Sequence, residues 1–134
     1  MDKVNELKVK IFADGADKVG MLEMYDKSYI KGLTTNPTLM KKVGITDYAA
    51  FCKDILETVN DKPLSFEVFS DDISDMRRQA LILRDLGENV WVKIPVSNTK
   101  REYTYDLIHE LSHEGVKLNL TALFTQEHVQ KVFD

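Results

Sequence analysis

The chain has 134 residues, of which 43% are hydrophobic and 30% charged, as in an ordinary globular domain. Its formal net charge of −4 gives no electrostatic reason to expect nucleic acid or an anionic membrane as a partner. No apolar run is long enough to span a bilayer, and residues 1–6 are polar, unlike a signal peptide. The single cysteine, Cys52, leaves no intrachain disulfide and suits a cytoplasmic location, with Cys52 itself expected in the core.

Alternation of apolar and polar segments predicts five strands, at residues 8–13, 31–34, 64–69, 90–96 and 116–124. Helical patterns lie between them, at residues 17–25, from 36 onward, 47–59, 70–86 and 98–115, and a last one begins at 125. Asp17, Asn36 and Thr125 are the expected N-caps, and Pro37 suits a first helical turn. Tyr103 is expected in the apolar stripe of the fifth helical region.

This order of strand and helix argues for an α/β fold with parallel strands and right-handed crossovers. The units are close in length to those of a barrel with eight strand–helix units. On the pattern alone, an open sheet and an incomplete barrel both remain possible.

Lys93 lies at the carboxyl end of the fourth predicted strand, just before Pro95, which cannot donate to a sheet ladder. A lysine in a largely buried strand is costly unless it is paired or has its pKa lowered for a chemical role. One interpretation is a lysine that extends to solvent or pairs with a carboxylate. The other is an amine nucleophile that forms a Schiff base with a carbonyl substrate.

Polar residues recur at the carboxyl ends of the predicted strands, which is the ligand side of both barrels and open parallel sheets. They are Asp14, Thr34, Asn36, Glu67, Lys93, Asn119 and Thr121. Each also has a structural interpretation: Asp14 and Asn36 as helix caps, Glu67 as a counter-ion, and the last strand's pair as partners of the backbone. Their joint recurrence favours a functional cluster.

These side chains fit imine chemistry. A Schiff base at Lys93 makes the substrate carbonyl an electron sink, and Glu67 and Asp14 are the carboxylates available to move protons. Thr121 is placed to orient a water molecule or a proton donor. Sugar hydroxyls are expected to bind Asn36, Asn119, Thr34 and Ser65.

Metal and cofactor chemistry find little support in the sequence. His109 and His113 lie four residues apart on one predicted helix, but Glu110 does not reproduce a zinc-protease motif, so both are interpreted as surface histidines. No glycine-rich phosphate loop or cofactor fingerprint is present, and we expect neither a metal nor a cofactor.

Five segments of the chain resemble transaldolases: residues 12–17 (FADGAD), 32–38 (GLTTNPT), 65–68 (SFEV), 92–95 (VKIP) and 115–121 (GVKLNLT). Their order and spacing match as well. The resemblance implies a (β/α)₈ TIM barrel and a cofactor-free enzyme of the pentose phosphate pathway. Such enzymes convert sedoheptulose 7-phosphate and glyceraldehyde 3-phosphate to erythrose 4-phosphate and fructose 6-phosphate by transferring a dihydroxyacetone unit.

The resemblance also implies roles for individual residues. Lys93 is the expected Schiff-base lysine, Asp14 and Glu67 the acid/base carboxylates, and Thr121 positions the catalytic water with Glu67. Substrate contacts are expected from Asn36, Thr34, Ser65 and Asn119. Glutamate at position 67, rather than glutamine, favours transaldolase over the related fructose-6-phosphate aldolases.

The chain is shorter than the family pattern by several strands. We therefore expect residues 1–134 to form one domain, the N-terminal portion of a barrel with only its first five β/α units. The phosphate-binding arginine and serine of the family's later strands are absent, and little activity is expected from this portion alone. The alternatives are a fructose-6-phosphate aldolase and an inactive half-barrel that associates with itself, as a homo-oligomer, or with a complementary barrel fragment.

Overall fold

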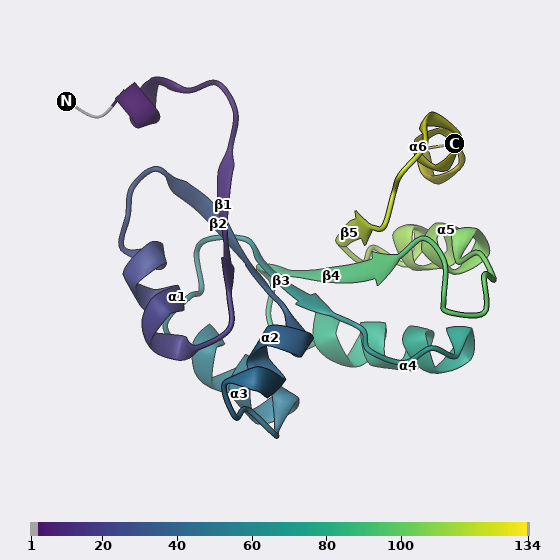
Figure 1. Ribbon diagram of the computed structural model, residues 1–134, viewed down its shortest axis with the longest axis horizontal. Helices are drawn as coiled ribbons and strands as arrows, with labels where there is room; N and C mark the ends of the chain where they lie inside the picture. The colour runs from purple at the N-terminus through teal and green to yellow at the C-terminus, as the bar shows by residue number, and fades with distance from the viewer. Residues whose placement is uncertain (1–2, 134) are drawn as a thin grey trace.

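The computed structural model describes residues 3–133, so residues 1 and 2 of the predicted polar N-terminus and residue 134 lie outside it. Within the described residues, five parallel strands form one sheet in the order β1-β2-β3-β4-β5. They are β1 (Ile11–Gly15), β2 (Ile30–Thr35), β3 (Leu64–Glu67), β4 (Val90–Pro95) and β5 (Leu118–Thr121). The sheet curls into half of a barrel (Figure 1), which confirms the predicted partial (β/α) barrel.

Each strand is followed by a helix, β2 is followed by two, and a short 3₁₀ turn precedes β1. The helical elements are the 3₁₀ turn η1 (Lys3–Glu6) and the α-helices α1 (Lys18–Tyr25), α2 (Pro37–Lys42), α3 (Tyr48–Leu56), α4 (Ile73–Arg84), α5 (Tyr105–His113) and α6 (Gln126–Phe133). Figure 1 shows α1, α2, α3 and α4 together on one side of the sheet. In the part of the chain that the structure describes, no helix is long and apolar enough to cross a membrane.

Capping side chains fix where several helices begin. Asp17 accepts a hydrogen bond from the Gly20 N–H, and Asn36 accepts from two N–H groups of α2, which has Pro37 at its first position. Thr125 accepts from the His128 N–H at the start of α6. All three predicted caps are therefore confirmed, because this chemistry is local to the sequence.

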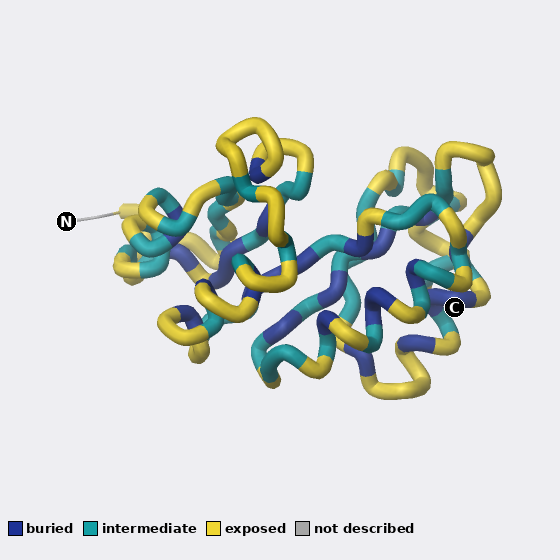
Figure 2. The backbone as a smooth tube through the Cα atoms, turned by 90° about the horizontal axis from the view of Figure 1, so that it is seen from below, coloured by how far each residue is buried: buried dark blue, intermediate teal, exposed yellow. Residues whose placement is uncertain are grey.

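The two faces of the sheet differ in character, since successive side chains of a strand point to opposite sides. Toward the helices lie fully buried apolar residues, including Leu33, Phe66, Val92 and Ile94, which form the core. Figure 2 shows this burial concentrated along the strands and the inner sides of the helices. The opposite, concave face carries polar residues singled out in the sequence, among them Asp14, Thr34, Ser65, Glu67, Lys93 and Asn119.

Some element boundaries differ from the prediction. β1 begins at Ile11 rather than at residue 8, β3 ends at Glu67, and β5 covers only Leu118–Thr121. Ala122, directly after β5, has a φ of 59°, which takes the chain out of the extended conformation of a strand.

The fifth helical region begins later than predicted. The Asn98 side chain accepts hydrogen bonds from the N–H groups of Lys100 and Glu102 and closes a turn there, so α5 begins only at Tyr105. Tyr103 therefore precedes the helix, and it is 54% exposed rather than part of the buried stripe.

Candidate active site

The strand register brings the predicted polar residues into adjacent rows on the concave face. Asp14 lies beside Thr34, and Thr34 beside Ser65, across β1, β2 and β3. A second row lies nearer the carboxyl end of β3, where Glu67 lies beside Lys93 and Lys93 beside Asn119. Residues far apart in the sequence are thus neighbours at the carboxyl end of the sheet, where barrel enzymes place their active sites.

Lys93 points into this face between two oxygen acceptors. Its Nζ atom donates to the backbone carbonyl of Thr35 at 3.2 Å and lies 3.8 Å from Oε2 of Glu67. The Lys93 side chain is 14% exposed and that of Glu67 29%. The lysine is therefore held against the sheet and paired with a carboxylate, rather than extended into solvent.

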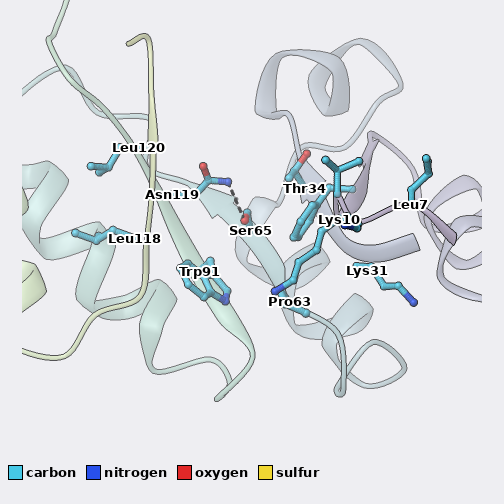
Figure 3. Close-up of a pocket in the computed structure, with 13 residues that line it drawn as sticks. Leu7, Lys10, Lys31, Thr34, Pro63, Ser65, Trp91, Leu118, Asn119 and Leu120 are labelled. Atoms are coloured by element: carbon cyan, nitrogen blue, oxygen red, sulfur yellow. Dashed lines mark hydrogen bonds between the residues drawn. The ribbon is translucent and has the colours of Figure 1, made fainter. Parts of the chain in front are cut away.

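One side-chain hydrogen bond joins β2 to β1, and another joins β5 to β3. Thr34 donates to Asp14 Oδ1 at 2.8 Å. Asn119 donates from Nδ2 to the Ser65 hydroxyl at 3.2 Å, the contact dashed in Figure 3. Ser65 is buried and Asp14 is exposed. Each of these groups keeps hydrogen-bonding capacity for a polyhydroxylated ligand, because a hydroxyl and a carboxylate oxygen both accept more than one bond.

Asn36 and Thr121 stand at the margins of the cluster. The Asn36 side-chain oxygen is occupied as the cap of α2, accepting from Thr38 and Leu39, so its predicted structural role is present. Thr121 ends β5, and the register places it beside Pro95, two residues beyond Lys93. Its carbonyl accepts from the Val96 N–H at 3.0 Å, which joins it to the segment that follows β4.

Thr35 and Tyr48 also contact the residues of this cluster, although neither was predicted to have a role. The Tyr48 hydroxyl accepts the Glu67 N–H at 2.9 Å and lies 3.2 Å from the Thr35 hydroxyl. Burial is the main reason that the pKa of Tyr48 lies well above its ordinary value, with the neighbouring Cys52 adding to it. Thr35 stands in the GLTTNPT segment, whereas Tyr48 lies in the helical region predicted at residues 47–59, outside the segments that carry the resemblance.

Two cavities open on this side of the molecule. One of about 840 Å³ lies over the amino-terminal half of the concave face (Figure 3), and its lining includes Thr34, Ser65, Asn119, Phe12, Trp91 and Lys10. A smaller one of about 410 Å³ lies at the carboxyl ends of β3 and β4, with Glu67, Pro95, Ser70, Asn98 and Thr99 in its wall. Glu67 therefore faces a hollow on the side where loops of a barrel admit substrate.

Within residues 3–133, no group of three or more histidine, cysteine, aspartate or glutamate side chains is arranged to hold a metal ion. His109 and His113 instead meet backbone carbonyls, of Lys131 and His109 respectively.

The structure is a partial (β/α) barrel, with a lysine and a glutamate paired at the carboxyl end of its curled parallel sheet. Comparison with known proteins agrees: the family model described as "Transaldolase/Fructose-6-phosphate aldolase" matches residues 11–134. The chain belongs to this family.

Curated relatives carry the name "Probable transaldolase". The chain is 37% identical over 117 residues to the one from Thermoanaerobacter sp. (strain X514), which covers 87% of this chain and 51% of that protein. It is 33% identical to the one from Dehalococcoides mccartyi, covering 87% and 52%, and 36% identical to the one from Aquifex aeolicus, covering 87% and 51%. The chain thus spans about half the length of the curated relatives it matches.

Proposed function

We propose that this chain carries the Schiff-base centre of a transaldolase, which transfers a dihydroxyacetone unit from a ketose phosphate to an aldose phosphate. The observation that carries the proposal is the position of the Lys93 amine, held by the Thr35 carbonyl at 3.2 Å with the Glu67 carboxylate at 3.8 Å. The names of the relatives support transfer as the reaction class.

In the proposed reaction the neutral Lys93 amine attacks the ketose carbonyl, and loss of water gives an iminium ion. The C3–C4 bond then breaks, its electrons enter the iminium to form an enamine, and the C4 hydroxyl loses its proton as the aldose leaves. Attack of the enamine on the acceptor aldehyde and hydrolysis of the new iminium return the free lysine. Glu67 and Asp14 are proposed to move these protons, and Thr121 to hold the water with Glu67.

Substrate hydroxyls are proposed to bind Thr34, Asn36, Ser65 and Asn119, of which all but Asn36 lie in the register rows on the concave face. We propose sugar phosphates as substrates, in the cytoplasmic pentose phosphate pathway and without a cofactor. Residues 1–134 are proposed to be the N-terminal portion of the barrel domain. We expect the phosphate contacts from a further part of such a barrel, and therefore little turnover by these residues alone.

A second candidate is an aldolase that cleaves or forms fructose 6-phosphate, since the matching family includes both activities. Comparing transfer to an added aldose phosphate with release of free dihydroxyacetone separates the two. Association with a second copy or with a complementary barrel fragment remains a third proposal. Light scattering tests it, and a clean monomer in isolation contradicts self-association.

The deciding experiment is borohydride trapping with fructose 6-phosphate, followed by peptide mass mapping. We expect a reduced adduct on Lys93 and none in Lys93→Ala. Lys62→Ala is the matched control, because that half-buried lysine contacts only backbone carbonyls of Tyr25 and Lys27 and the Tyr25 ring among its observed contacts. An intact, folded protein without an adduct on Lys93 contradicts the proposed function.

A further inference from the structure

The pairing of β2 with β3 ends before it reaches Glu67. Its register pairs Leu33 with Leu64 and Thr34 with Ser65, and no later pair follows among the described residues. The Leu33 N–H donates to the Pro63 carbonyl at 2.8 Å. A parallel ladder that continued in this register would direct the N–H of Glu67 to the carbonyl of Thr35.

The Tyr48 hydroxyl accepts the Glu67 N–H in place of the Thr35 carbonyl. The Glu67 N–H donates to the Tyr48 oxygen at 2.9 Å, and the Thr35 carbonyl accepts the Lys93 amine at 3.2 Å instead. The helix residue thus satisfies a backbone donor at the exposed end of β3, and the carbonyl that the ladder would have used serves the lysine.

Proton counting fixes the direction of the remaining bond. The Thr35 hydroxyl has one proton, which it donates to the Ser65 carbonyl at 3.0 Å. The contact of 3.2 Å between the two hydroxyls must then be a donation from Tyr48 to Thr35. Tyr48 therefore accepts from β3 and donates to β2, and the donation requires a protonated phenol.

The ring itself is held in place. It packs edge to face against Phe66, with ring centroids 6.2 Å apart, and against Phe69, at 5.8 Å. Asp47 caps α3 one residue earlier by accepting the Ala50 N–H, which fixes the first turn of the helix. The hydroxyl is thereby positioned by packing as well as by its own hydrogen bonds.

We propose that Tyr48 is a positioning residue for the Lys93 amine: its hydroxyl takes the Glu67 N–H out of the sheet ladder and so reserves the Thr35 carbonyl for the lysine. The inference rests on the proposed role of Lys93 in imine formation. Tyr48 does not reach the amine itself. It acts through two backbone groups, one on the residue that accepts from Lys93 and one on the residue that carries the facing carboxylate.

The test compares Tyr48→Phe with Tyr25→Phe in the full chain. Each variant loses one hydroxyl, but the Tyr25 hydroxyl donates to Asp61 at 2.7 Å, away from the site. With dihydroxyacetone and borohydride as probe, Tyr48→Phe is expected to trap Lys93 about 10-fold more slowly and with an altered pH profile. Tyr25→Phe is expected to trap at the wild-type rate. Equal rates for Tyr48→Phe and wild type, in proteins that unfold at the same temperature, overturn the proposal.

A second measurement does not depend on imine chemistry. In protein labelled at lysine ¹³Cε, the Lys93 resonance is expected to move in Tyr48→Phe and to stay in place in Tyr25→Phe. If wild-type protein forms no adduct, the proposed function fails, but this resonance still decides whether Tyr48 positions the amine. An unmoved Lys93 resonance in folded Tyr48→Phe overturns the inference by itself.

Discussion

The amine of Lys93 and the carboxylate of Glu67 face each other across adjacent parallel strands, 3.8 Å apart, at paired positions of the β3–β4 register. The separation exceeds that of a direct hydrogen bond, so the amine is attracted to the carboxylate without being bonded to it. The contact is therefore an ion pair without a direct hydrogen bond.

Glu67→Gln removes the carboxylate but keeps the size of the side chain. We expect trapping of Lys93 with fructose 6-phosphate to slow by about 10²- to 10⁴-fold, the range for loss of a general acid or base. Glu57→Gln, at an exposed C-cap of α3, is the control and should trap normally. Trapping at the wild-type rate in Glu67→Gln would show that Glu67 is only a counter-ion.

Asn36→Ala separates a capping role from a substrate contact. Loss of the cap should lower the free energy of unfolding by about 0.5–2 kcal/mol, measured by urea titration. Asp72→Ala, which removes the cap of α4, should cost a similar amount and leave trapping unchanged. If Asn36 also contacts substrate, only Asn36→Ala weakens trapping at subsaturating fructose 6-phosphate. Equal trapping in the two variants assigns Asn36 to capping alone.

The predictable part of the structure is the part determined by local chemistry. Asp17 and Asn36 cap helices by accepting from N–H groups two or three residues away, so their positions in the sequence predict where the helices begin. The alternation of strands and helices similarly predicted parallel strands, although it left an open sheet and an incomplete barrel both possible. Lys93, Glu67 and Asn119 could be expected at one edge because parallel strands align their carboxyl ends.

What escaped prediction depends on partners distant in sequence or on competition between local bonds. The Tyr48 hydroxyl forms hydrogen bonds with Thr35 and Glu67, which lie 13 and 19 residues away. The periodicity of a helix indicates that its ring is apolar but not what its hydroxyl bonds to. Asn98 was expected to open a helix, but its side chain accepts from N–H groups two and four residues ahead and closes a turn. Both bonding modes are open to asparagine, and the sequence does not distinguish them.

Gly32→Ala probes the concave face near Phe12. A Cβ atom built at Gly32 lies 2.0 Å from the Phe12 ring and 3.0 Å from the Pro63 carbonyl oxygen, so the ring must move. Phe12 is 46% exposed and can swing away, which limits the loss in the free energy of unfolding to about 1–3 kcal/mol. In a Phe12→Ala background the same substitution should cost markedly less. Additive effects of the two changes would contradict the contact.

The stability of the protein at alkaline pH tests whether burial keeps the Cys52 thiol protonated. It is fully buried, and desolvation raises the pKa of its thiol to about 12. An unfolded cysteine loses its proton near pH 8.5, so above that pH the folded state binds more protons than the unfolded state. The free energy of unfolding should therefore fall as pH rises from about 8.5 toward 12.

The buried Tyr48, whose pKa is also raised by burial, acts in the same direction above pH 10. Cys52→Val removes the thiol contribution together with the part of the raised Tyr48 pKa that Cys52 causes, so the difference between wild type and Cys52→Val reports Cys52 and its effect on Tyr48. Urea unfolding at pH 8, 9.5 and 11 should show wild type losing stability faster than the variant. Parallel pH profiles of the two proteins would mean that the thiol is not held in the protonated form by burial.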